Sequence, residues 1–188
     1  VAFPTETVYG LGGNGLNKEA SKKIYAAKGR PSDNPLILHI ADMEQFYPLI
    51  KTDNAKIIAR AEALADVFWP GPLTMILPKA DNIPYETTGG LDTVAIRMPS
   101  HLVARALLQE CKMPIAAPSA NLSGRPSPTS ASHVIEDMNG RIEMIIDGGD
   151  VGIGVESTII DLTGEVPMLL RPGFVTPEML QQVLGTVE

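Results

Sequence analysis

The chain has 188 residues, of which 44% are hydrophobic and 20% are charged, and its formal net charge is −7. Such a composition is typical of a globular protein with one buried core, while the negative charge argues against broad nucleic-acid binding, which needs a basic surface. Cys111 is the only cysteine, so no internal disulfide can form. No apolar run approaches the ~20 residues that span a membrane. These features together fit a cytoplasmic protein.

Apolar, β-rich runs alternate with helical patterns along the chain. Strands are expected at residues 1–3, 36–40, 73–77, 94–98, 115–117, 144–147, 157–162 and 168–170. Helices are expected at residues 17–28, 53–68, 101–110 and 131–138, with a further helix start at Thr176. Because several strands follow one another without an intervening helix, the order predicts an α/β fold with a mixed parallel and antiparallel sheet and flanking helices.

The glycine-rich segment Gly10–Gly15 satisfies the dinucleotide-binding pattern G-x-G-x-x-G. That motif needs a strand that runs into its first glycine and a helix that opens at its last. Here Pro4 to Tyr9 follow the expected strand, and Leu16 and Asn17 precede the expected helix. We therefore interpret the glycines as a close-packed turn. The chain also has no Walker lysine motif and no G-x-S-x-G nucleophile elbow.

Two cations, Lys28 and Arg30, lie at the end of the first expected helix, with Asn34 just beyond them. A cation at a helix C-terminus stabilises the helix by roughly 0.3–1 kcal/mol, which accounts for Lys28. It does not account for Arg30, which lies between Gly29 and Pro31 in a rigid turn. A guanidinium fork beside a lysine ammonium suits a polyphosphate.

Two further arginines lie on expected strands. Arg97 lies inside an apolar run, where a charge is costly unless it is paired or faces a pocket, and Arg171 ends a strand at a Pro-Gly turn. With Arg30, these arginines have no obvious acidic neighbours, which predicts a site for an anionic ligand. His39 also lies inside an apolar strand, as either a satisfied core histidine or a site residue. The three histidines show no metal-binding spacing.

A series of short motifs resembles, in the same order, those of the YrdC-type threonylcarbamoyl-AMP synthases. The motifs are Pro4-Thr5-Glu6-Thr7-Val8-Tyr9-Gly10-Leu11-Gly12, Lys28-x-Arg30, Pro70-Gly71-Pro72-Leu73-Thr74, Ala117-Pro118-Ser119-Ala120-Asn121, Glu156-Ser157-Thr158 and Leu170-Arg171-Pro172-Gly173. Each motif is weak by itself, but the ordered set is specific and covers nearly the whole chain. The resemblance implies a twisted mixed sheet around a concave cationic cavity.

The resemblance also implies an activity: forming threonylcarbamoyl-AMP and pyrophosphate from L-threonine, bicarbonate and ATP. It implies that L-threonine is held by Thr7, His39, Arg97, Ser119 and Ser157. It implies that ATP is held by Arg30, Asn34, Thr93, Asn121, Thr129 and Arg171, with Lys28 near the phosphates. We expect Lys28 and Arg30 to stabilise the phosphates as the catalytic residues. Magnesium is expected to arrive with ATP, since no acidic cluster marks a metal site in the chain.

Residues 1–188 are expected to form one catalytic domain. The start at Val1 suggests that the native N-terminus is missing, and some family members carry a linker and a further C-terminal domain. The expected downstream partner is a tRNA-modifying threonylcarbamoyl transferase. The sequence leaves two alternative functions open. One is a module that binds double-stranded RNA or tRNA, which the net charge of −7 disfavours. The other is a paralogue that handles a different carbamoyl adenylate.

Overall fold

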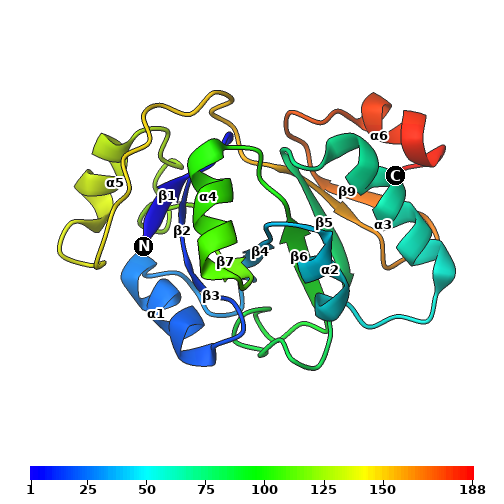
Figure 1. Cartoon of the computed structure of the whole chain (residues 1–188), viewed down its shortest axis with the longest axis horizontal. Helices are drawn as coiled ribbons and strands as arrows, with labels where there is room; N and C mark the ends of the chain where they lie inside the picture. The colour runs from blue at the N-terminus through cyan, green and yellow to red at the C-terminus, as the bar shows by residue number, and fades with distance from the viewer.

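A seven-stranded mixed sheet lies at the centre of the computed structural model, which describes all residues from Val1 to Glu188 (Figure 1). Its strands, in spatial order, are β3 (Gly13–Asn14), β7 (Ile115–Ala116), β4 (Ile37–His39), β6 (Thr93–Arg97), β5 (Leu73–Pro78), β8 (Thr158–Asp161) and β9 (Met168–Arg171). The β4–β6 and β5–β8 pairs are parallel and the other pairs are antiparallel. The predicted mixed sheet is therefore confirmed. A separate antiparallel pair holds β1 (Ala2–Pro4) and β2 (Tyr9–Leu11).

The helices begin and end close to where the sequence places them. They are α1 (Lys18–Lys28), α2 (Met43–Phe46), the 3-10 helix η1 (Tyr47–Leu49), α3 (Ala55–Phe68), α4 (Leu102–Cys111), α5 (Ala131–Met138) and α6 (Pro177–Leu184). The Asn17 side chain accepts hydrogen bonds from the first turn of α1, and Gly29 ends this helix in the left-handed conformation at φ 60°. None of the helices is both long and apolar enough to cross a bilayer.

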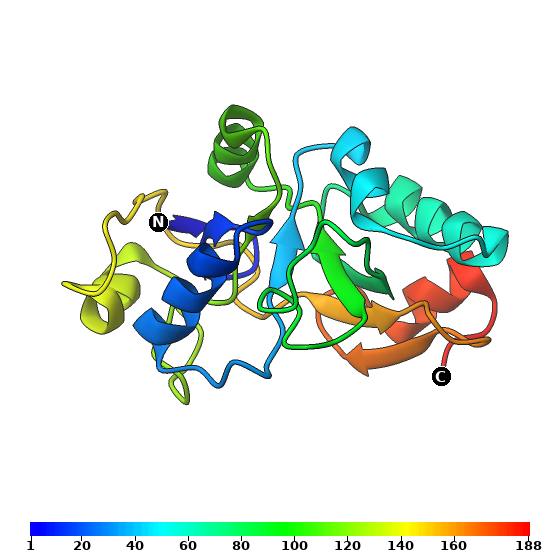
Figure 2. The same ribbon diagram turned by 90° about the horizontal axis from the view of Figure 1, so that it is seen from below.

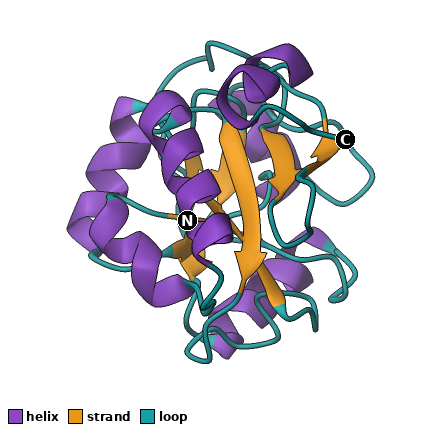
Figure 3. Ribbon diagram, turned by 90° about the vertical axis from the view of Figure 1, so that its right-hand side faces the viewer, coloured by secondary structure: helices purple, strands orange, loops and turns teal.

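Helices α3 and α6 lie together at the end of the molecule that holds the C-terminus, while α1 and α5 lie at the opposite end with the N-terminus (Figures 1 and 2). The helices flank the strands on several sides (Figure 3). Buried side chains of α3, among them Leu64, share one apolar core with Leu38, Met75 and Ile96 of the central strands. One face of the sheet is thus closed by apolar packing.

The opposite face of the same strands is only partly covered. Since side chains alternate along a strand, the neighbours of the core residues point to this second face. They include the half-buried residues Ile37, Ile76, Ala95 and Ile159. This open face carries the site described below.

Two sequence-based expectations are wrong. Residues Met144–Asp147 do not form a strand, because Ile145 makes only an isolated bridge to Ala2. The glycine-rich segment is not a simple turn, because Gly10 lies in β2 and Gly13 in β3. Its close packing is confirmed at Gly12, where a Cβ atom would lie 2.7 Å from the ring of Phe3. The short elements β2, β3 and α2 lacked a periodic pattern long enough to predict them.

Candidate anion-binding site

One row of residues crosses five neighbouring strands on the open face. His39 of β4 is the register partner of Arg97 of β6, and Arg97 is the partner of Thr74 on β5. Thr74 pairs in turn with Ile159 of β8, which pairs with Arg171 of β9. Partners in register point to the same face, so the pairing brings both arginines and the histidine to one surface.

A cavity of about 190 Å³ lies over this row. Eight of the residues proposed to bind substrates line it: Thr7, Arg30, Asn34, His39, Arg97, Ser119, Ser157 and Arg171. They come from the turn after β1, the loop after α1, four strands or strand ends, and the loop after β7. Segments far apart in the sequence therefore converge as the resemblance implied.

Four other proposed residues are not among those lining the cavity. Thr93 lies on the same face of β6 as Arg97, beyond Ala95. Thr129 lines a neighbouring polar pocket of about 400 Å³. Asn121 lies in the loop that carries Ser119, and Lys28 is hydrogen-bonded to this loop.

Lys28 is buried and holds the loop after β7. Its Nζ donates to the backbone carbonyl of Ser119 and, at 2.6 Å, to that of Asn121. The Asn121 side-chain amide donates in turn to the carbonyls of Leu122 and Arg125, at 2.9 and 2.8 Å. Burial, and to a lesser degree the charge of Arg30, lowers the pKa of Lys28 to about 8. In this structure Lys28 therefore shapes the loop that forms one wall.

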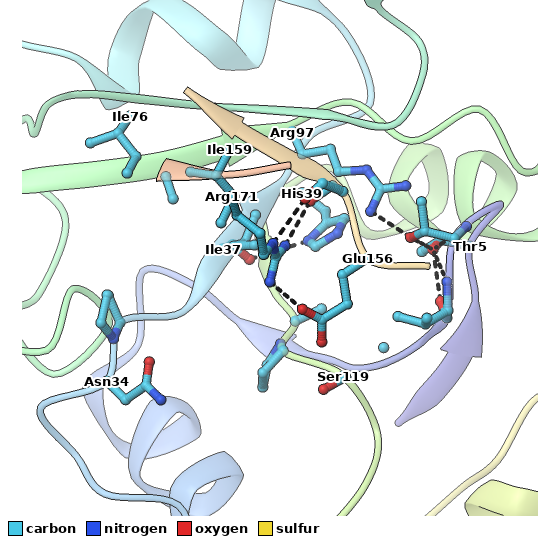
Figure 4. A pocket seen from close by; sticks show the side chains of 18 of the residues that line it. Thr5, Asn34, Ile37, His39, Ile76, Arg97, Ser119, Glu156, Ile159 and Arg171 are labelled. Carbon is cyan, nitrogen blue, oxygen red and sulfur yellow. Dashed lines mark hydrogen bonds and ion pairs between the residues drawn. The ribbon is translucent and has the colours of Figure 1, made fainter. Parts of the chain in front are cut away.

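Each of the three guanidinium nitrogens of Arg97 donates a hydrogen bond within the protein. Its Nη2 donates to Oε1 of Glu6 at 2.6 Å, its Nη1 to the hydroxyl of Thr7 at 2.9 Å, and its Nε to the carbonyl of Gly71 at 3.3 Å. The hydroxyl of Thr5 donates to the carbonyl of Val8 at 2.7 Å, which leaves Thr7 to donate to Thr5. Figure 4 shows the Arg97 side chain pointing toward this turn.

Arg171 lies on the other side of the cavity, where Glu156 points toward it (Figure 4). The two side chains form an ion pair, and the second Glu156 oxygen accepts from the Ser127 hydroxyl at 2.7 Å. Arg171 also donates from Nε to the Ser157 carbonyl at 2.9 Å and from Nη2 to the Ser157 hydroxyl at 3.1 Å. The Ser157 hydroxyl lies 2.7 Å from that of Thr74.

Arg30 forms no ion pair with a carboxylate. Its Nη2 donates to the side-chain oxygen of Asn34 at 2.6 Å and to the carbonyl of Pro35 at 3.1 Å. Its Nε donates to the Asn34 carbonyl at 3.2 Å. These bonds hold the guanidinium against its own loop, with its Nη1 group free for a ligand.

His39 is buried next to Arg97 and stays neutral. Burial is the main cause that lowers the pKa of His39 to about 3, and the positive charge of Arg97 is the second cause. Its Nδ1 lies 3.2 Å from the carbonyl of Ile37, and because a carbonyl only accepts, Nδ1 carries the proton in this bond.

The expectation that the three arginines lack acidic neighbours is wrong for Arg97 and Arg171. Their partners Glu6 and Glu156 are 91 and 15 residues away in the sequence, and only the fold brings them close. Both glutamates lie inside the motifs that resemble the family. The cost of an unpaired arginine in an apolar strand signals that a partner exists, but it does not say which residue that partner is. Thr5 and Thr74 were also missed.

The site nevertheless retains cationic character. Its three arginines have only two carboxylate partners, Glu6 and Glu156. Burial lowers the pKa of all three guanidinium groups from the ordinary value for arginine, and the two glutamates only partly oppose this lowering at Arg97 and Arg171. A buried cation without full compensation favours an anionic ligand. No group of three or more His, Cys, Asp or Glu side chains lies close enough to hold a metal ion. The arrangement can therefore align anions through arginines, hydroxyls and amides.

Comparison with known proteins places this geometry in a family. The Sua5/YciO/YrdC family model, described as telomere recombination, matches residues 1–173. The chain belongs to the Sua5/YciO/YrdC family. The resemblance seen in the motifs is thereby confirmed.

Other Sua5/YciO/YrdC proteins resemble the chain over its full length. The threonylcarbamoyl-AMP synthase of Pyrococcus abyssi (strain GE5 / Orsay) is 59% identical over 187 residues, which are 100% of this chain and 54% of the relative. That of Bacillus subtilis (strain 168) is 57% identical over 188 residues, 100% of this chain and 53% of the relative. The crystal structure of P. abyssi Sua5 complexed with L-threonine matches with a TM-score of 0.94 and 58% identity, covering 100% of this chain and 54% of that one. The chain thus spans about half the length of these relatives.

Proposed function

We propose that the chain forms threonylcarbamoyl-AMP and pyrophosphate from L-threonine, bicarbonate and ATP, as a nucleotidyltransferase of the cytoplasm. The observation that carries the proposal is the convergence of Arg30, Arg97 and Arg171 on one cavity lined by hydroxyl groups. The names of the P. abyssi and B. subtilis relatives and the L-threonine complex of P. abyssi Sua5 support the substrates. The product would pass to a tRNA-modifying threonylcarbamoyl transferase.

The reaction needs alignment and charge neutralisation more than a nucleophilic side chain. Bicarbonate gives carbon dioxide and hydroxide, the threonine amine forms a bond to the carbon of carbon dioxide, and the amine proton leaves with the hydroxide as water, which gives a carbamate. A carbamate oxygen then forms a bond to the α-phosphorus of ATP, and the bond from this phosphorus to the bridging β-phosphate oxygen breaks. Pyrophosphate leaves with the electron pair. Prepositioned cations lower the barrier of such a step because its reactants and its leaving group are all anions.

The side chains divide between the two substrates. Arg97 would bind the threonine carboxylate or the carbamate, with Thr7, His39, Ser119 and Ser157 around it. The ATP set would be Arg30, Asn34, Thr93, Asn121, Thr129 and Arg171, with Lys28 acting beside the Ser119 loop. Lys28 and Arg30 would stabilise the phosphates. The residues present do not form a magnesium site by themselves, so magnesium enters this proposal only as part of the ATP substrate.

A nucleic-acid-binding module is the main alternative function. A net charge of −7 counts against it, and a binding constant that falls steeply with salt would support it. Contact with tRNA is therefore the weaker proposal. The other alternative, a paralogue that uses a different carbamoyl acceptor, is tested by replacing threonine with each other amino acid.

The decisive assay measures pyrophosphate release with ATP, L-threonine and bicarbonate together and with each of them omitted. We expect release to require all three. Arg30→Ala should reduce the rate by roughly two orders of magnitude, the effect of losing one prepositioned donor to the transition state. Lys51→Ala, which removes an exposed cation paired with Asp81, is the matched control and should keep the wild-type rate. Full threonine-dependent release by the Arg30→Ala variant would show that Arg30 does not bind the phosphates.

A further inference from the structure

Glu6 has no assigned role, yet its carboxylate connects two segments around Arg97. Its Oε1 accepts from Nη2 of Arg97 at 2.6 Å, and its Oε2 accepts from the backbone N–H of Ser100 at 3.1 Å. Both oxygens must be acceptors, and only a carboxylate provides two, because an amide offers one acceptor and one donor group. Glu6 thus ties the turn after β1 to the segment between β6 and α4.

We propose that Glu6 is a positioning residue that fixes the guanidinium of Arg97 for the carboxylate of the substrate. This inference rests on the proposed function. Arg97 has five N–H bonds, and its contacts with Gly71, Thr7 and Glu6 use one on each nitrogen. One N–H therefore remains on each of Nη1 and Nη2. These two N–H groups are the donors left on Arg97 for an anion that enters the cavity.

The burial of the pair makes the orientation depend on Glu6. The side chains of Arg97 and Glu6 are 4% and 13% exposed, so neither has bulk water as an alternative partner. Burial alone would raise the pKa of Glu6, but the charge and hydrogen bond of Arg97 bring this pKa below its ordinary value. Without Glu6, the buried guanidinium would lack a counterion and would turn toward the water of the cavity. A bound carboxylate would then meet an arginine that is no longer held in place.

The test compares Glu6→Gln with the wild type and with the control Asp81→Asn, which removes a carboxylate that is 82% exposed from a distant ion pair. Titration calorimetry of L-threonine should give a Kd at least tenfold higher for Glu6→Gln, while the Kd for ATP stays within twofold. Asp81→Asn should leave both constants unchanged. Threonine binding as tight as in the wild type, or tighter, would overturn the proposal.

A double variant shows whether Glu6 acts through Arg97. If it does, Glu6→Gln/Arg97→Met should bind threonine no more weakly than Arg97→Met alone. A further loss in the double variant would mean that Glu6 acts by another route and would refute the proposal. Should Glu6→Gln fail to fold, Glu6→Asp keeps the charge but shortens the side chain, and the same comparisons apply with the same expected direction.

A measurement without substrate separates this inference from the proposed function. The Nε–H of Arg97 is buried and bonded to Gly71, so its NMR signal should exchange slowly with water in the wild type. We expect much faster exchange in Glu6→Gln, while backbone amide signals of the central strands stay protected. An unchanged Arg97 signal would refute the positioning role. If the wild type binds no threonine, the proposed function fails, and this signal still decides whether Glu6 holds Arg97.

Discussion

Two arginines that line one cavity, Arg97 and Arg171, are each paired with a glutamate, but the surroundings of the two pairs differ. The side chains of Arg97 and Glu6 are 4% and 13% exposed, whereas those of Arg171 and Glu156 are 34% and 38% exposed. Arg97 also bonds to Thr7 and Gly71, which belong to distant segments of the chain. The remaining partner of Arg171 is Ser157, the residue next to Glu156.

The two environments indicate which pair can rearrange when a ligand binds. Opening the buried pair would disconnect Arg97 from Glu6, two residues that are 91 positions apart in the sequence. Opening the exposed pair releases a Glu156 side chain that is already 38% exposed, and moving it into solvent would also break its hydrogen bond with Ser127. If the two arginines bind substrates as proposed, Arg97 would do so as a fixed group, while Arg171 would exchange its carboxylate partner for a phosphate.

The sharpest test of this contrast is the stability of two matched variants. Arg97→Met leaves the Glu6 carboxylate buried without its partner and should lower the free energy of unfolding by about 3–5 kcal/mol. Arg171→Met breaks a partly solvated pair and should lower it by about 0–1 kcal/mol. Urea denaturation of both variants measures the two losses. Equal losses would mean that the two pairs contribute alike to the fold.

The double variant Glu6→Gln/Arg97→Met provides the control for the buried pair. It removes the orphaned charge, so it should recover part of the stability lost in Arg97→Met. A double variant less stable than Arg97→Met would show that Glu6 stabilises the protein mainly through Ser100.

The pH dependence of the free energy of unfolding should reflect His39, which lies next to the buried pair. His39 has a pKa near 3 in the folded protein, below the ordinary value of 6.5, so the unfolded chain binds its proton first as the pH falls. Stability should therefore fall from pH 6.5 toward pH 3, by up to about 1.4 kcal/mol per pH unit from this group. The lowered pKa of Glu6 acts in the same direction, but only below the ordinary pKa of 4.5 for a glutamate.

His39→Phe should flatten this dependence between pH 6.5 and 4.5, as measured by urea denaturation at several pH values. The Ile37 carbonyl stays bonded to the N–H of Ala117 at 2.9 Å, so the change leaves no unpaired acceptor there. His133→Phe, at an exposed position on α5, is the matched control and should keep the wild-type slope. An unchanged slope in His39→Phe would mean that His39 titrates normally.

Local patterns in the sequence predict the helices well because the signals lie within a few residues. The caps Asn17 and Thr176 and the end of α1 at Gly29 appear where the side-chain chemistry places them. The strands of the central sheet other than β3 are visible as apolar runs. Segment Met144–Asp147 has the same apolar character and yet lacks a partner strand, because pairing is decided by the rest of the fold.

The site shows the same limit. The arginines could each be found in the sequence, since a charge in or beside an apolar strand needs an explanation. What the sequence alone does not state is the strand order that places Arg97 and Arg171 in one row through Thr74 and Ile159. For the same reason Glu6 and Glu156 were not recognised as their partners.

The smallest expected effect concerns Glu156 and decides whether the two pairs work differently. If Arg171 binds ATP, Glu156 competes with the phosphates for Nη1 of Arg171. Glu156→Gln should then tighten ATP binding by about two- to fivefold, the range for loss of one partly exposed charge interaction. Titration calorimetry at low salt measures it, because salt screens such interactions. Glu165→Gln, at a carboxylate 93% exposed between β8 and β9, is the control and should not change the Kd.

The opposite sign would be equally informative. Weaker ATP binding in Glu156→Gln would mean that Glu156 holds Arg171 in place for its ligand, as Glu6 is proposed to hold Arg97. The partial exposure of the Arg171 pair would then not indicate that a phosphate can replace Glu156, and the two pairs would differ only in how deeply they are buried. Tighter binding would instead establish that one cavity combines a fixed arginine with one released by its substrate.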